Sequence, residues 1–167
     1  MSMEWLYPDE YVDSIYHIDF AKLREIGYKG ILFDIDNTLV PFDRKHPDPK
    51  LMAFIRSLQQ MGFSICLVSN NNHQRVKEFN DVLKVVAIPK ANKPFTMNLK
   101  KAMAKIGTGA RDTMMVGDQL FTDMWAGNQL KLYTILVKPI QEKEEWITRI
   151  KRGIEKLLIQ QYLRKKR

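Results

Sequence analysis

The chain alternates short apolar runs with longer segments in which apolar residues recur every three or four positions. Five runs have the length of a β-strand, at 31–34, 64–68, 84–88, 113–116 and 132–137. Helical periodicity fills the gaps near 50–61, 72–82, 95–105 and 121–129. Because strand and helix alternate, the pattern predicts a three-layer α/β/α, Rossmann-like fold whose five-stranded, mainly parallel sheet is covered by helices on both faces.

Three parts of the chain differ in composition. With 167 residues, 45% hydrophobic and 28% charged, the chain has the size of one globular domain. We expect a core at about 30–138, an aromatic lead-in at 1–29 and a basic amphipathic helix at about 142–164. Neither extension is long enough for a second domain, so we expect residues 1–167 to form a single domain.

Positive charge is concentrated at the C-terminal end. The formal net charge is +8, and residues 138–167 hold ten Lys or Arg against four Glu. No apolar run has the length of a transmembrane helix, and the first residues lack the basic start of a secretory signal, so we expect a cytoplasmic protein. Cys66, the only cysteine, lies in an apolar strand and is expected to be buried.

The first predicted strand ends in two carboxylates, Asp34 and Asp36, with Ile35 between them. Alternating side-chain directions would place both acids on the same side of the chain. Two carboxylates this close repel each other unless a cation or a shared proton neutralises them, so the pair predicts a divalent metal site. A hydrogen-bonded turn is the alternative, because Asp and Asn are also common in turns.

Later strands also end in polar residues. The second strand runs into Ser69 and Asn70, Lys93 follows the third, and the fourth runs into Asp118 and Asp123. The carboxyl ends of parallel strands meet at one edge of the sheet, where α/β folds bind ligands. We therefore expect these side chains to converge on the first acidic pair.

Together these side chains supply the parts that phosphoryl transfer requires. One carboxylate can attack phosphorus to give an aspartyl-phosphate, and a second can protonate the leaving oxygen and later activate water. A lysine and a hydroxyl can stabilise charge on the phosphoryl oxygens, while a metal bridges nucleophile and phosphate. A receiver domain uses similar groups, but its acceptor acid follows the third strand, where this chain has Ala-Ile-Pro-Lys at 87–90.

The order of these residues resembles the four motifs of the haloacid-dehalogenase-like phosphatases. The matching positions are Asp34-Ile35-Asp36-Asn37-Thr38, Ser69, Lys93 and Gly117-Asp118 through Asp123. The resemblance covers about 30–138 and implies a Mg²⁺-dependent phosphomonoester hydrolase that works through an aspartyl-phosphate.

The resemblance also implies catalytic and metal-binding roles. Asp34 would be the nucleophile and Asp36 the general acid and base. The Asp34 carboxylate, the Asp36 main-chain carbonyl and Asp118 would bind Mg²⁺. Asp123 would either reach the metal through water or orient Lys93, and it could instead cap the following helix.

Three residues would bind the phosphoryl group by the same resemblance: Ser69, Asn70 and Lys93. Two alternatives remain open. Ser69 could be the N-cap of the helix at 72–82, and Lys90 competes with Lys93 for the phosphate.

Many relatives in this family carry a cap domain over the site, but the intervals 40–65 and 71–93 leave no room for one. An uncovered site favours a macromolecular substrate, a lipid head group at a surface, or closure by a partner subunit. Within the family, the Asp-Ile-Asp-Asn-Thr-Leu core, the Lys-Pro pair and the Gly-Asp-Gln string resemble the bacterial YqeG group, which is similar to phosphatidylglycerophosphate phosphatases. This resemblance implies a phospholipid head group as substrate.

The two extensions raise the question of partners. The predicted C-terminal helix has an apolar face formed by Trp146, Ile147, Ile150, Ile154, Leu157 and Leu158. A basic amphipathic helix suits the inner, anionic surface of a membrane, and packing against the sheet is the alternative. The aromatic residues of the lead-in, which we expect to dock on the core, are Trp5, Tyr7, Tyr11 and Tyr16. Action on RNA or a ribonucleoprotein, as phosphatase or binding module, is the other functional hypothesis, although no RNA-binding motif is present.

Overall fold

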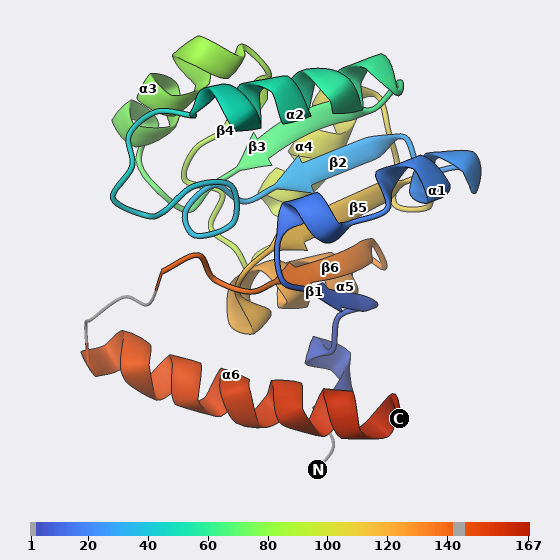
Figure 1. The fold of residues 1–167 in the computed structure, drawn as a ribbon, viewed down its shortest axis with the longest axis vertical. Coiled ribbons are helices and arrows are strands. Elements are labelled where there is room, and N and C mark those ends of the chain that lie inside the picture. Colours follow the sequence, from blue (N-terminus) through green and yellow to red (C-terminus); the bar gives the residue numbers. More distant parts are fainter. Residues whose placement is uncertain (1–2, 142–145) are drawn as a thin grey trace.

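A parallel β-sheet forms the middle layer of the protein (Figure 1). The computed structural model describes residues 3–141 and 146–167, the latter segment with side chains from residue 150 onward. The strands are β1 (Glu10–Val12), β2 (Gly30–Phe33), β3 (Ser64–Val68), β4 (Val86–Ile88), β5 (Thr113–Gly117) and β6 (Tyr133–Val137), in the spatial order β1-β6-β5-β2-β3-β4. All pairings between these strands are parallel. The predicted α/β fold is therefore confirmed.

One strand, β1, was not predicted, so the expected count of five strands is wrong. Its three residues are only half-buried and give no apolar run. β1 pairs with β6. Just before it, the Asp9 N–H donates to the Thr134 carbonyl (2.9 Å), and the Thr134 N–H donates to Asp9 Oδ2 (2.8 Å). The lead-in is thus tied to the edge of the sheet.

Helices cover both faces of the sheet. The helices on one face are α1 (Phe20–Glu25), α2 (Pro49–Gln60) and α3 (His73–Leu83), and those on the other are α4 (Met97–Ile106) and α5 (Trp125–Gln129) (Figure 1). The central strand β2 serves both layers, because Ile31 and Phe33 pack into one core and Leu32 into the other. The helix predicted at 121–129 consists of a π-helical segment, Leu120–Met124, followed by α5.

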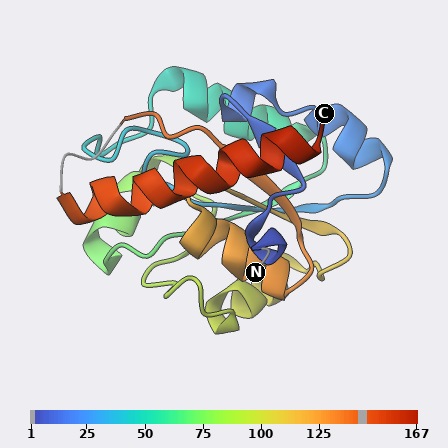
Figure 2. The same cartoon turned by 90° about the horizontal axis from the view of Figure 1, so that it is seen from below.

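The C-terminal helix α6 (Trp146–Lys165) crosses the end of the molecule beside β1 and β6 (Figures 1 and 2). Leu158 and Tyr162 are buried. Ile150, Ile154 and Leu157 are 57%, 45% and 62% exposed, so three of the four described members of the predicted apolar face point away from the protein. The side chains of 146–149, which include two members of that face, lie outside the described residues. No helix in the described part of the chain combines the length and the hydropathy needed to cross a membrane.

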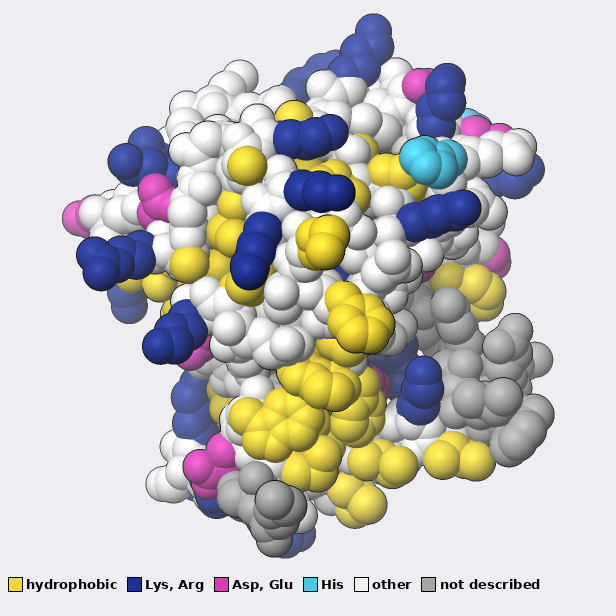
Figure 3. All heavy atoms as spheres, turned by 180° about the vertical axis from the view of Figure 1, so that it is seen from behind, with side chains coloured by type: hydrophobic (Ala, Val, Ile, Leu, Met, Phe, Trp, Pro, Cys, Tyr) yellow, Lys and Arg dark blue, Asp and Glu magenta, His cyan; other side chains and the backbone are white. Residues whose placement is uncertain are grey.

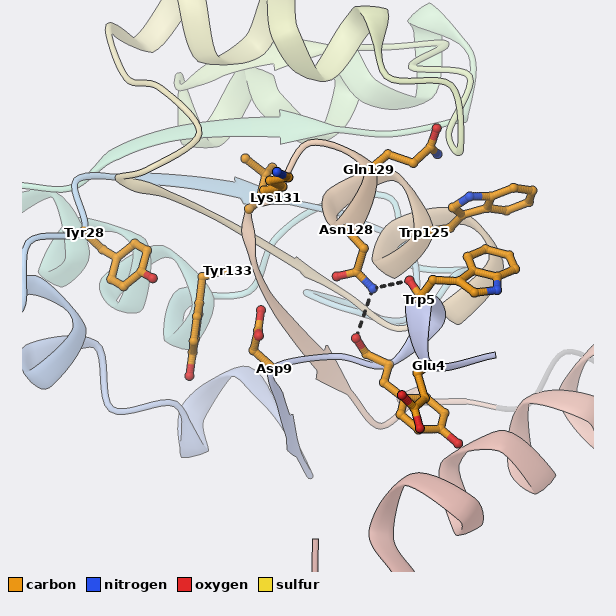
Figure 4. A pocket seen from close by; sticks show the side chains of 11 residues that line it. Glu4, Trp5, Asp9, Tyr28, Trp125, Asn128, Gln129, Lys131 and Tyr133 are labelled. Carbon is orange, nitrogen blue, oxygen red and sulfur yellow. Dashed lines mark hydrogen bonds between the residues drawn. The ribbon is translucent and has the colours of Figure 1, made fainter. Parts of the chain in front are cut away.

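The lead-in packs against α5 and β6 around a cavity of about 550 Å³ (Figure 4). The Trp5 and Trp125 rings meet edge to face at 5.0 Å, and the Asn128 amide donates to the carbonyls of Trp5 and Tyr7 (2.7 and 3.0 Å). Trp5 nevertheless stays 48% exposed and Tyr16 40% exposed. The expectation that these aromatic residues dock on the core is therefore met only in part. None of the predicted site residues lines this cavity.

Candidate active site

The predicted site residues lie where β2, β3 and β5 end. Asp34 follows β2, Ser69 follows β3, and Asp118 follows β5. β2 lies between β3 and β5, so the chain order reverses at this point, as it does where doubly wound sheets bind ligands. A cavity of about 280 Å³ opens here, lined by Asp34, Asp36, Ser69, Asn70, Asn71, Lys93, Gln119 and Thr122.

Lys93 joins two carboxylates at the base of this cavity. Its Nζ donates to Asp34 Oδ1 (2.9 Å) and Asp123 Oδ1 (2.7 Å), and the side chain is 2% exposed. Burial alone would lower the pKa of Lys93, but Asp123 and Asp34 outweigh it and raise the pKa, so the ammonium stays charged. Lys90, the alternative phosphate ligand, is exposed and does not line the cavity.

Asp123 is fully buried, and both of its carboxylate oxygens have donors. Besides Lys93 at Oδ1, the N–H groups of Asp118 and Gln119 donate to Oδ2 (3.2 Å each). Gly117 makes room for it, since a Cβ there would lie 2.3 Å from the Asp123 carboxylate. Burial raises the pKa of Asp123 to about 6 against the opposing effect of Lys93. Asp123 is therefore in direct contact with Lys93, and α5 begins without a side-chain cap.

Asp34, Asp118 and Asp123 form a cluster of acids that could hold a metal ion. One carboxylate oxygen from each lies within 4.8 Å of the others, and the Thr38 hydroxyl lies 3.1 Å from Asp34 Oδ2 and 3.3 Å from Asp118 Oδ1. Burial raises the pKa of Asp118 well above its usual range, and the nearby carboxylates of Asp34 and Asp123 raise it further. Several hard oxygen ligands at this spacing fit a divalent cation such as Mg²⁺.

Asp36 lines the same cavity but lies outside the acidic cluster. Its Oδ1 accepts a hydrogen bond from Arg75 Nη2 (2.9 Å), and its Oδ2 accepts one from Asn71 Nδ2 (3.2 Å). The sequence analysis missed Arg75, which lies on α3 with its guanidinium over the Phe79 ring (5.5 Å). Nothing in the residue pattern distinguishes it from an ordinary basic residue on a helix surface.

Ser69 and Asn70 form the turn after β3. The Asn71 N–H donates to Ser69 Oγ (3.1 Å). Asn70 makes two hydrogen bonds with the backbone of Lys93, accepting from its N–H (2.8 Å) and donating to its carbonyl (3.0 Å). The N-cap of α3 is Asn72, so the alternative that Ser69 caps this helix is wrong. Asn70 thus fixes the loop that carries the lysine.

The C-terminal helix also reaches the acidic cluster. Arg152 Nη2 donates to Asp118 Oδ2 (2.8 Å), and its Nη1 donates to the Asp118 main-chain carbonyl (3.1 Å). The sequence analysis predicted a basic amphipathic helix here but did not single out Arg152, and it missed this contact. No motif signals it, because α6 lies outside the segment that the motifs span.

Comparisons with known proteins agree with this geometry. A family model described as HAD-hydrolase-like matches residues 90–156. A Bacillus subtilis (strain 168) protein named "Probable phosphatase YqeG" is 38% identical over 165 residues, which are 99% of this chain and 96% of that relative. The chain belongs to the YqeG group of haloacid-dehalogenase-like phosphatases. It is accordingly an enzyme of the phosphatase class.

More distant relatives extend the comparison. The chloroplastic/mitochondrial phosphatidylglycerophosphate phosphatase 1 of Arabidopsis thaliana is 27% identical over 172 residues, and its match covers 97% of this chain and 49% of that relative. Among solved structures, the cobalt-bound deoxy-D-mannose-octulosonate 8-phosphate phosphatase of Haemophilus influenzae matches with a TM-score of 0.52 at 15% identity, covering 68% of this chain and 69% of that one. That structural likeness shows the shared fold.

Proposed function

We propose that this member of the YqeG group hydrolyses phosphomonoesters through an aspartyl-phosphate on Asp34. The observation that carries the proposal is the convergence of Asp34, Lys93 and Asp118 at the switch point of the sheet. Lys93 holds one oxygen of the Asp34 carboxylate, and the hydroxyl of Thr38 lies at the other. This arrangement presents a fixed carboxylate nucleophile to a cavity that also contains a permanent positive charge.

In the first displacement, an Asp34 oxygen bonds to phosphorus while the bond to the ester oxygen breaks, and Asp36 gives that oxygen a proton. In the second, Asp36 takes a proton from the water that attacks the aspartyl-phosphate, and phosphate leaves. The contacts from Arg75 and Asn71 hold Asp36 at the cavity for both steps. Ser69 and Lys93 line the cavity and would bind the phosphoryl oxygens.

The carboxylates of Asp34 and Asp118 and the main-chain carbonyl of Asp36 would hold Mg²⁺. The bound ion would neutralise charge on the phosphoryl oxygens as a Lewis acid. Asp123 Oδ1 accepts from Lys93 Nζ at 2.7 Å, and two backbone N–H groups hold its Oδ2, which supports a role in orienting Lys93.

We propose a phospholipid head-group monoester, with phosphatidylglycerophosphate foremost, as the substrate. The named activity of the plant relative supports this substrate. The open cavity supports it too, because only a loop and α2 separate β2 from β3, and only α3 separates β3 from β4. A head group held at a lipid surface can reach such a site without a cap domain.

Peripheral contact with the inner, anionic face of a membrane completes the proposal. The outward face of α6 carries Ile150, Ile154 and Leu157 at helical spacing, with the exposed Lys151 beside them. Figure 3 shows hydrophobic side chains gathered across the lower part of the rear face, with Lys and Arg around them. The half-exposed Trp5 suits the water–lipid boundary, where tryptophan is favoured.

Replacing the nucleophile tests the reaction class. We expect wild type to hydrolyse a generic aryl phosphate only with Mg²⁺, and Asp34→Asn to lose at least about 10³-fold in kcat, because an amide cannot attack phosphorus. Asp43→Asn, the same change at an exposed loop position, should leave turnover intact. Hydrolysis by Asp34→Asn at the wild-type rate would show that the nucleophile is misassigned.

A substrate panel tests the lipid assignment. Phosphatidylglycerophosphate in mixed micelles should give a kcat/KM well above that of glycerol 3-phosphate, a nucleoside 5′-monophosphate or a 5′-phosphorylated RNA. A preference for the RNA end would transfer the substrate assignment to nucleic acid while leaving the reaction class unchanged.

A further inference from the structure

Arg152 contacts both the side chain and the main chain of Asp118. The guanidinium is 15% exposed and the carboxylate is fully buried. Arg152 donates a hydrogen bond to Asp118 Oδ2, and the Thr38 hydroxyl lies beside Oδ1 of the same carboxylate. One planar guanidinium thus reaches a carboxylate oxygen and the main-chain carbonyl of the same residue, which a single point charge cannot do with the same geometry. Asp118 is thereby held in one orientation.

Glu155 extends this contact along the loop after β5. It lies one turn beyond Arg152, is 5% exposed, and accepts a hydrogen bond from Arg152 Nη1 (3.3 Å). Burial raises the pKa of the Glu155 carboxyl, while Arg152 and the backbone at Leu120 and Phe121 oppose that rise. Two side chains one turn apart on α6 therefore lie against the loop after β5, and Arg152 contacts Asp118 directly.

This buried pair is poorly explained by stability alone. The cost of removing two charges from water offsets much of their attraction, and apolar residues of similar size often stabilise a protein as well. A role in orienting Asp118 accounts for the choice of an arginine, because the same guanidinium reaches both a carboxylate oxygen and a carbonyl oxygen.

We propose that α6 is a positioning element of the metal site and that Arg152 is its positioning residue. The inference rests on the proposed role of Asp118 as a metal ligand. By holding Oδ2, Arg152 keeps the rest of the carboxylate group turned toward the cluster with Asp34. Removing this hold leaves Asp118 free to rotate away from two other buried acids that repel it.

Charge and orientation make opposite predictions. As a cation close to a metal site, Arg152 would weaken metal binding, so its loss would tighten binding if charge alone mattered. Glu155 lies 3.3 Å from the same guanidinium and offsets its field. Orientation should therefore dominate, and loss of Arg152 should weaken binding.

Calorimetric titration of the full chain with Mg²⁺ and Mn²⁺ tests the inference without measuring activity. We expect Arg152→Gln to weaken the affinity by about 10-fold or more, the scale found when groups that orient metal ligands are removed. Arg152→Lys should also weaken it, because an ammonium cannot span both Asp118 oxygens. Arg164→Gln, the same charge change at an exposed position of α6, should bind like wild type.

The thermal midpoint in EDTA separates positioning from stability. The role of Arg152 is only structural if Arg152→Gln melts at a lower temperature but, well below that midpoint, binds metal with the affinity of wild type. Equal or tighter metal binding by Arg152→Gln would therefore overturn the inference. If Arg152→Gln does not fold, Arg152→Lys decides by the same criterion, because it keeps the positive charge and loses the planar contact. Asp118→Asn separates the two proposals. If Asp118→Asn binds metal as tightly as wild type, the metal site and the inference are both refuted. If Asp118→Asn loses metal binding while Arg152→Gln keeps the wild-type affinity, the inference alone is refuted.

Discussion

Gly117 is where the packing of the acidic cluster is tightest. A Cβ at this position would lie 2.3 Å from the Asp123 carboxylate, which in turn holds Lys93. Gly117→Ala must therefore displace Asp123, and we expect a lower thermal midpoint and at least about 10-fold slower aryl phosphate hydrolysis.

Gly153→Ala provides the control, because a Cβ there meets nothing within 4 Å. In a helix this change should be neutral or stabilise by up to about 1 kcal/mol. If Gly117→Ala melted and turned over like wild type, Asp123 would have room to move without consequence, and its orienting role would be wrong.

Cys66 is expected to be unreactive in the folded protein. Its side chain is buried, and burial raises the pKa of the thiol to about 12, which Lys105 opposes only weakly. At pH 8 the thiol is therefore neutral and inaccessible, and Ellman's reagent should react with it only after unfolding in guanidinium. Stoichiometric reaction within minutes in native buffer would contradict the buried position.

At the residue scale, sequence reasoning found the polar groups that stand at strand ends and missed those that helices supply. Asp34, Ser69 and Asp118 each follow an apolar run, so their common edge was predictable. Arg75 and Arg152 contact acids that lie 39 and 34 residues away. Their positions depend on how α3 and α6 dock, which no local pattern encodes.

At the scale of elements, β1 shows why short edge strands escape prediction. Its three half-buried residues give no apolar run, and it is held by pairing with β6 and by the hydrogen bonds between Asp9 and Thr134. The boundaries of the five predicted strands, by contrast, lie within about two residues of those observed, because those strands carry continuous apolar runs.

Removing the Asp9 carboxylate tests the importance of this edge. Asp9→Ala deprives the Thr134 N–H of its acceptor, and we expect a loss of about 1–3 kcal/mol in the free energy of unfolding, measured in urea. Asp13→Ala, on the exposed turn after β1, should change it by less than about 0.5 kcal/mol. Equal stability of the two variants would mean that the contact at β1 contributes little.

The helix α6 shows the limit of apolar periodicity as a guide to packing. The sequence predicted an amphipathic helix, and a helix is present. Its inward side, however, combines Leu158 and Tyr162 with the ion pair of Arg152 and Glu155. A hydrophobic stripe indicates that a face is suited to an apolar contact, but not whether that contact is the protein's own core or an external surface.

At the scale of the whole molecule, α6 connects two surfaces that the motifs leave separate. Its inner side holds the loop of Asp118, and its outer side presents Ile150, Ile154 and Leu157 to solvent. A membrane bound to the outer side would therefore contact the same rigid helix that orients a metal-ligand candidate. Substrate delivery and metal-site geometry would then depend on one element.

Vesicle sedimentation tests the outer surface. Wild type should bind vesicles of phosphatidylglycerol and phosphatidylcholine better than phosphatidylcholine alone, and less well as salt rises. The double variant Ile154→Gln and Leu157→Gln should weaken binding at least about 10-fold, because each side chain contributes up to about 1.5–3 kcal/mol when buried in lipid. Ile26→Gln, at a residue 64% exposed beside α1, should bind like wild type, and all three proteins should hydrolyse a soluble aryl phosphate equally. Undiminished binding by the double variant would exclude α6 as the membrane contact, whatever lipid the enzyme hydrolyses.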